Sequence, residues 1–99
     1  MRLLRWMVLF MTAALPAFAQ SAPPPEVLRD LAPTGKLRAA INYGNSVLAQ
    51  KGPDGAPRGV SADLAGELAK RLGVPADYVP YEAAGKAFER AKAGAWDVG

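Results

Sequence analysis

The chain has 99 residues, with 12 Lys and Arg against 9 Asp and Glu, a formal net charge of +3, and neither Cys nor His. The lack of Cys excludes a disulfide framework, a zinc–thiolate site and a lipid anchor on a cysteine. The lack of His excludes Ser-His-Asp and Cys-His nucleophile pairs assembled from this chain. From residue 20 onward, 10 basic residues stand against 9 acidic ones, so no basic block indicates nucleic-acid binding.

The first segment has the three parts of a secretory signal peptide. Arg2 and Arg5 form a positive start, Trp6–Leu15 is an apolar run, and Ala17–Ala19 reads as an A-x-A cleavage site. A transmembrane anchor is the alternative, but it needs about 20 apolar residues. We therefore expect residues 1–19 to be a signal peptide, with cleavage after Ala19 and delivery to the periplasm, and not a lipoprotein.

The next segment, residues 20–33, contains Pro23, Pro24 and Pro25 and is expected to be a Pro-rich spacer followed by a short helix over Glu26–Ala32. Residues 34–99 then form the folded part. Lys36–Asn42 is largely apolar, which predicts a strand buried on both faces, as in a parallel sheet. The turn-rich stretch around Asp54 and Gly55 predicts the tip of a small hairpin.

The clearest helix pattern covers Ser61–Leu72. Leu64, Leu68 and Leu72 recur at helical spacing and are expected to face the core, Ser61 is the expected N-cap, and Gly73 ends the helix. A second strand is predicted at Val74–Tyr81, a second helix at Ala83–Ala93 with Phe88 on its apolar face, and the start of a third strand at Trp96–Gly99.

Strands that alternate with helices predict an α/β domain with a mainly parallel sheet and right-handed crossovers. The sheet looks unfinished at Trp96–Gly99, and about 80 residues bury little core. The chain is therefore expected to be the N-terminal piece of a longer protein.

Few residues offer chemistry. With no His, no Cys and no clustered acids, we expect no metal site, no cofactor and no catalytic group. Ala84–Lys86 is better explained as a helix entry than as a phosphate site, and Asp97 is expected to close a loop locally. The loop Asn42–Ser46 follows the carboxyl end of the first strand, where open α/β sheets bind ligands. Asn42, Tyr43 and Asn45 could hold a polar ligand there, although a plain polar turn explains the same residues.

Three segments resemble the start of bacterial extracellular solute-binding proteins of family 3, the periplasmic receptors of amino-acid ABC transporters. They are GKLRAAINYGN (Gly35–Asn45), GVSADLAGELAKRLGV (Gly59–Val74) and AGKAFERAKAGAWDVG (Ala84–Gly99). The resemblance implies a fold of two α/β lobes that close on a ligand, of which this chain is the first part of lobe one. It also implies a non-enzymatic, monomeric receptor that binds a polar amino acid or similar small solute and delivers it to an inner-membrane permease.

The resemblance carries site residues over as well. Asn42 occupies a position where the family often has an acidic residue, which disfavours a cationic ligand side chain. The family's aromatic position lies near Asn45, with Tyr43 as a substitute, and Glu82 and Lys86 border the cleft in relatives. A sensor domain or a dehydratase-like protein of the same fold, and a small complete periplasmic interaction protein, remain as alternatives.

Overall fold

The computed structural model describes residues 22–99, so the predicted signal peptide and the start of the spacer lie outside the described residues. The elements are α1 (Pro25–Leu31), β1 (Leu37–Asn42), β2 (Gln50–Lys51), β3 (Pro57–Arg58), α2 (Val60–Leu72), β4 (Ala76–Tyr81) and α3 (Ala84–Ala91). Up to α3, this order of helices and strands is the predicted one, and it confirms an α/β arrangement. Among the described residues, no helix is long and apolar enough to cross a membrane.

The central sheet is built on β1. It pairs in parallel with β4 along its whole length, from Leu37 opposite Ala76 to Asn42 opposite Tyr81. Its other edge carries a single parallel bridge between Ala39 and Val98. The predicted third strand is therefore present only as this one bridge.

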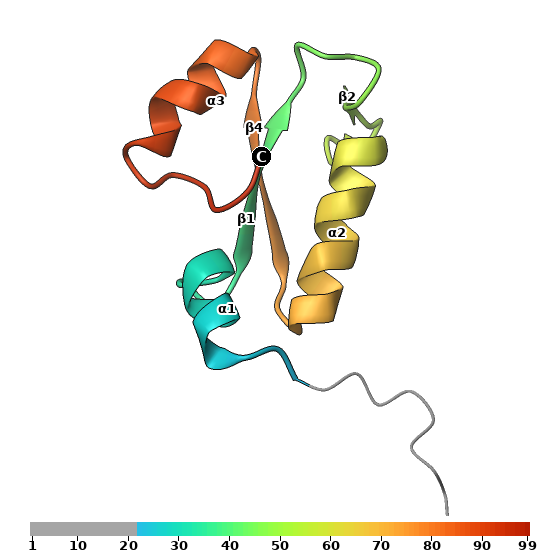
Figure 1. Ribbon diagram of the computed structural model, residues 1–99. Helices are drawn as coiled ribbons and strands as arrows, with labels where there is room; N and C mark the ends of the chain where they lie inside the picture. The colour runs from blue at the N-terminus through green and yellow to red at the C-terminus, as the bar shows by residue number, and fades with distance from the viewer. Residues whose placement is uncertain (1–21) are drawn as a thin grey trace, which may run out of the picture.

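Helices cover both faces of the sheet, with α2 on one side and α3 on the other, while α1 lies beside the amino end of β1 (Figure 1). Side chains alternate along β1: Leu37, Ala39 and Ile41 are almost fully buried, whereas Arg38, Ala40 and Asn42 are only half-buried. The expectation that the strand is buried on both faces is therefore met on the α2 side only, because α3 covers its face less completely and has no buried residue of its own.

Helix α2 corrects two predictions. It begins one residue before Ser61, Gly59 occupies the N-cap position and no side chain caps the helix. Its buried residues are mainly small, namely Ala62, Ala65, Ala69 and Leu72, whereas Leu64 is 66% exposed. Small side chains let the helix backbone approach the sheet closely, which turns Leu64 to the flank of the helix. Gly73 ends the helix in the left-handed conformation, as predicted.

The hairpin and α3 complete the fold. β2 and β3 pair antiparallel around the turn that contains Asp54, whose carboxylate accepts a hydrogen bond from the Ala56 N–H at 3.1 Å. Phe88, expected on a packed face of α3, is 71% exposed. The segment after α3 is held instead by Trp96, whose ring N–H donates to the Ala87 carbonyl at 2.8 Å.

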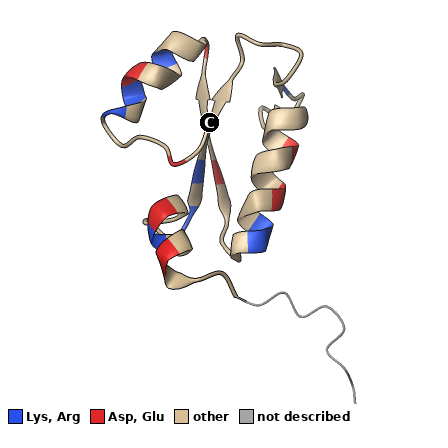
Figure 2. Ribbon diagram, in the orientation of Figure 1, with Lys and Arg blue, Asp and Glu red and all other residues tan. Residues whose placement is uncertain are grey.

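Charged residues of both signs occur on each of the three helices, with no block of one sign in the described part of the chain (Figure 2). The main electrostatic contact instead joins Arg38 on β1 to Asp97. The Asp97 carboxylate accepts hydrogen bonds from the Arg38 backbone N–H at 2.9 Å and from two guanidinium nitrogens at 3.2 and 2.8 Å. The expectation that Asp97 closes a loop locally is wrong, because its partner lies 59 residues away in the sequence.

Candidate binding cleft at the end of strand β1

Two asparagines shape the loop that leaves the carboxyl end of β1. The side-chain oxygen of Asn42 accepts a hydrogen bond from the Gly44 N–H at 2.9 Å. The side-chain oxygen of Asn45 accepts one from the Val47 N–H at 3.2 Å. Each asparagine thus closes a local turn through its carbonyl oxygen.

These turns determine which polar atoms are left for a ligand. An asparagine amide has one acceptor oxygen and one NH₂ group with two donors. Because the backbone occupies both side-chain oxygens, the NH₂ groups of Asn42 and Asn45 are the parts without a partner among residues 22–99. The loop therefore offers hydrogen-bond donors.

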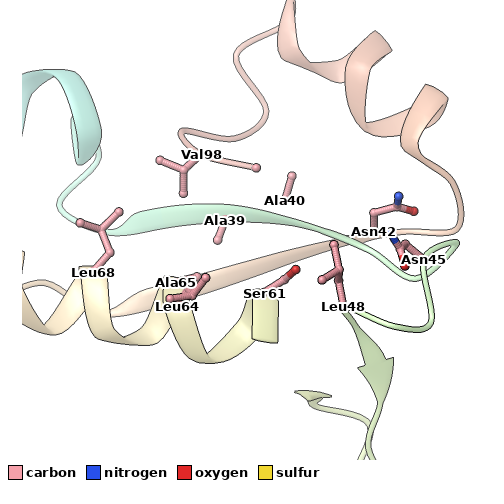
Figure 3. A pocket seen from close by; sticks show the side chains of 11 residues that line it. Ala39, Ala40, Asn42, Asn45, Leu48, Ser61, Leu64, Ala65, Leu68 and Val98 are labelled. Atoms are coloured by element: carbon pink, nitrogen blue, oxygen red, sulfur yellow. The ribbon is translucent and has the colours of Figure 1, made fainter. Parts of the chain in front are cut away.

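Both asparagines are among the residues that line a cleft of about 390 Å³ between β1 and α2. Its polar end is formed by Asn42, Asn45 and Ser61, the last from the first turn of α2 (Figure 3). Apolar side chains form the rest of the wall, namely Ala39, Ala40, Leu48, Leu64, Ala65, Leu68 and Val98, with the backbone of Gly99. No charged side chain from residues 22–99 lines it.

A second cavity, of about 280 Å³, lies on the α3 side of the same strand. It is lined by Ala40, Asn42, Ala84, Ala87, Phe88, Trp96 and Gly99. Asn42 borders both cavities, so it lies where the two faces of the sheet meet at the free edge of β1.

Some of the predicted site residues line the larger cleft in the structure, and others do not. It brings Asn42 and Asn45 together on the larger cleft. Tyr43 packs against the buried cluster of Ile41, Ala49 and Ala62, and lines neither cavity. Glu82 and Lys86 also line neither cavity, although they follow the carboxyl end of β4, which lies in register with Asn42.

Of the residues that line the cleft, only Asn42 and Asn45 were predicted as site residues, and others had been given a different role. Ser61 was interpreted as a helix cap and Leu64 as a core residue, yet both line the cleft. The sequence does place Ser61 at the start of a helix that packs on the first strand, which was the available signal for it. The described residues contain no group of three or more His, Cys, Asp and Glu that could hold a metal.

The position of Ser61 depends on the chain immediately before α2. The Ser61 N–H donates to the Leu48 carbonyl at 3.0 Å, which ties the start of α2 to the loop after β1. Gly59 makes this approach possible, because a Cβ there would lie 2.7 Å from the Leu48 carbonyl oxygen. Backbone contacts therefore fix the position of Ser61 beside Leu48 in the wall of the cleft.

Comparisons of the chain with protein-family models, with curated proteins and with solved structures found no match.

Proposed function

We propose that this protein is the periplasmic substrate-binding component of an ABC transporter for polar amino acids or similar small solutes. Residues 34–99 would form the first part of lobe one of a two-lobe binding protein. The observation that carries the proposal is that Asn42 and Asn45, whose amide NH₂ groups have no partner among residues 22–99, both line a cleft at the carboxyl end of a parallel strand. Open α/β sheets bind their ligands at this edge.

The donors on the cleft suggest which part of the solute they meet. Since the amide oxygens are engaged in turns, the Asn42 and Asn45 side chains can donate to a ligand but have little capacity left to accept. A side-chain carbonyl or carboxylate oxygen suits them, and an ammonium group does not. The absence of acidic groups from the lining also argues against a cationic side chain.

In this proposal the chain binds its solute and performs no reaction. It acts as a monomer in the periplasm, closes around the solute together with the second lobe, and docks on an inner-membrane permease. Hinge closure of this kind is a common way for two-lobe proteins to enclose a ligand. The three sequence segments given above support this assignment.

Substitution of Asn42 tests the site. We expect Asn42→Ala to weaken binding by between a few-fold and roughly a hundredfold, which is the range for one lost hydrogen bond with or without an unsatisfied partner. Asn42→Asp keeps an oxygen for the Gly44 N–H but loses the donor, so it should weaken binding with little change in folding. Isothermal titration calorimetry of the protein at its full natural length with glutamine, glutamate, asparagine and aspartate measures both.

Ser46→Ala is the matched control, because Ser46 lies in the same loop and does not line the cleft. It should leave the affinity unchanged. If Asn42→Ala binds the solute as well as the unchanged protein, Asn42 is only a turn residue and Asn45 becomes the next candidate.

Export is tested separately. We expect the periplasmic fraction to contain a chain that begins at Gln20, because the apolar run ends at an A-x-A site. Mass spectrometry of the intact protein gives the N-terminus, and Ala19→Arg should block processing. A membrane-bound product that keeps residues 1–19 would contradict the periplasmic assignment.

A further inference from the structure

The chain contains two asparagines, Asn42 at the end of β1 and Asn45 in the loop that follows (Figure 3). Asparagine is a thermolabile residue, because the backbone nitrogen of the next residue can attack the carbon of its side-chain amide. This attack requires a side chain folded back over the next peptide group, a side-chain oxygen that can take up negative charge, and a following N–H that is free of other contacts. The structure distinguishes the two asparagines by the last of these conditions.

Both asparagines have the folded-back side chain. The side-chain oxygen of Asn42 accepts a hydrogen bond from the Gly44 N–H at 2.9 Å, and that of Asn45 accepts one from the Val47 N–H at 3.2 Å. Each bond closes a turn that bends the side chain over the peptide group in between. The same donor stabilises the negative charge that develops on this oxygen during attack. Both amide groups are therefore activated in the same way.

The backbone N–H after each asparagine differs. The Tyr43 N–H donates to the Tyr81 carbonyl at 2.9 Å, which continues the pairing of β1 with β4. The Ser46 N–H has no acceptor among residues 22–99, and the Ser46 residue is exposed. Attack by the Tyr43 nitrogen must therefore first break a hydrogen bond of the sheet, whereas attack by the Ser46 nitrogen breaks none.

We propose that Asn45 is a site of spontaneous deamidation. The Ser46 nitrogen loses its proton to hydroxide and bonds to the Asn45 side-chain carbon Cγ. The bond between this carbon and the NH₂ group breaks, and the NH₂ group takes a proton from water and leaves as ammonia. Water then opens the resulting succinimide ring at either of its carbonyl groups, which leaves aspartate or isoaspartate at this position.

The reaction changes the polar end of the cleft. Either product replaces the NH₂ donor of Asn45 with a carboxylate, which only accepts hydrogen bonds. It also adds a negative charge to a lining in which residues 22–99 place no charged side chain. The reaction requires only the loop geometry and water, so the proposal does not depend on solute binding.

The test follows amide loss at each asparagine in the intact folded protein, kept at mildly alkaline pH. Digestion at acidic pH, where the reaction is slow, and tandem mass spectrometry then locate the mass gain. Capped peptides of residues 43–47 and 40–44 give the two rates without the fold. Asn45 should react within about threefold of the rate in its peptide, because no hydrogen bond has to break first. Asn42 should react roughly tenfold or more slowly than in its peptide, the factor expected for one net hydrogen bond.

Ser46→Pro is the matched variant. Proline has no N–H and cannot attack the amide, it suits the second position of a turn, and the Ser46 N–H that it removes has no acceptor among the described residues. Amide loss at Asn45 should stop, while the rate at Asn42 and the circular dichroism spectrum stay unchanged.

An Asn45 that keeps its amide in the folded protein would overturn the proposal, as would equal slowing of both asparagines relative to their peptides. Amide loss that continues in Ser46→Pro would also overturn it, because direct hydrolysis by water would then be the reaction. The comparison of the two asparagines uses the unchanged protein, so it decides the proposal even where the proline variant does not fold.

Discussion

Asp97→Ala should destabilise the protein substantially. The Asp97 side chain is only 4% exposed and accepts the Arg38 backbone N–H, so its removal leaves that donor unpaired in a partly buried place. An unsatisfied donor of this kind costs about 1–3 kcal/mol. The same substitution should weaken the attachment of the Trp96–Val98 segment to β1, which then depends on its backbone hydrogen bonds and on Trp96 alone. Urea unfolding followed by circular dichroism measures the loss.

Asp77→Ala is the matched control. Asp77 is an exposed aspartate on β4 that makes no hydrogen bond to Arg38, although its charge lies near the guanidinium group. Its removal should change the free energy of unfolding by less than about 0.5 kcal/mol. If the Asp97 and Asp77 variants unfold at the same urea concentration, Asp97 does not anchor the third segment of the sheet.

The contact between Asp97 and Arg38 also predicts that the stability of the protein depends on pH in the acidic range. Burial alone raises the pKa of Asp97, but the side-chain and backbone hydrogen bonds from Arg38, together with its charge, outweigh burial and hold this pKa below its ordinary value. A carboxyl whose pKa is lowered by folding stabilises the folded state fully above its unfolded pKa of about 3.9. This stabilisation is lost as the pH falls through the lower folded pKa. The free energy of unfolding of Asp97→Asn should therefore differ most from that of the unchanged protein above about pH 4. The difference between the two should shrink on further acidification.

Gly59→Ala should have the largest effect of any single substitution discussed. Gly59 has φ 108° and ψ −175°, a region that almost only glycine adopts and that costs other residues about 1–3 kcal/mol. An added Cβ would also lie 2.7 Å from the Leu48 carbonyl oxygen, which is a backbone atom that cannot rotate away. The backbone strain and the steric overlap together should lower the free energy of unfolding by more than about 3 kcal/mol.

The damage should reach the cleft as well. Relief of the clash requires the start of α2 to move away from Leu48, which breaks the Ser61 N–H bond to the Leu48 carbonyl. The polar end of the cleft would then open, and solute affinity should fall together with stability. Thermal unfolding and calorimetric titration of one preparation measure the two effects.

Gly55→Ala separates strain from steric overlap. Gly55 also has positive φ, at 83°, but nothing lies within 4 Å of an added Cβ. In Gly55→Ala the free energy of unfolding should fall only by the cost of placing alanine in the left-handed conformation, about 1–2 kcal/mol. Equal losses at Gly55 and Gly59 would show that the contact with Leu48 is unimportant.

The order and type of the elements could be predicted from the sequence, because they depend on local patterns. Alternation of apolar segments indicated the strands and helices, and glycine at position 73 indicated the end of α2 through its freedom to adopt positive φ. The position of Asn42 and Asn45 at the end of the first strand was also readable, since it follows from the length of that strand. Such features are determined by neighbours within a few residues.

Other features were decided only by tertiary structure. Helical spacing shows that Leu64 and Ala65 lie next to each other on one surface, but only the packing of α2 against β1 determines that Ala65 is buried and Leu64 exposed. Asp97 looked like a local loop residue because its partner, Arg38, is 59 residues distant. Ser61 becomes a cleft residue only when Leu48 lies against the start of α2. Local patterns define which residues can share a face, whereas the choice among those faces depends on close packing and backbone pairing between segments far apart in the chain.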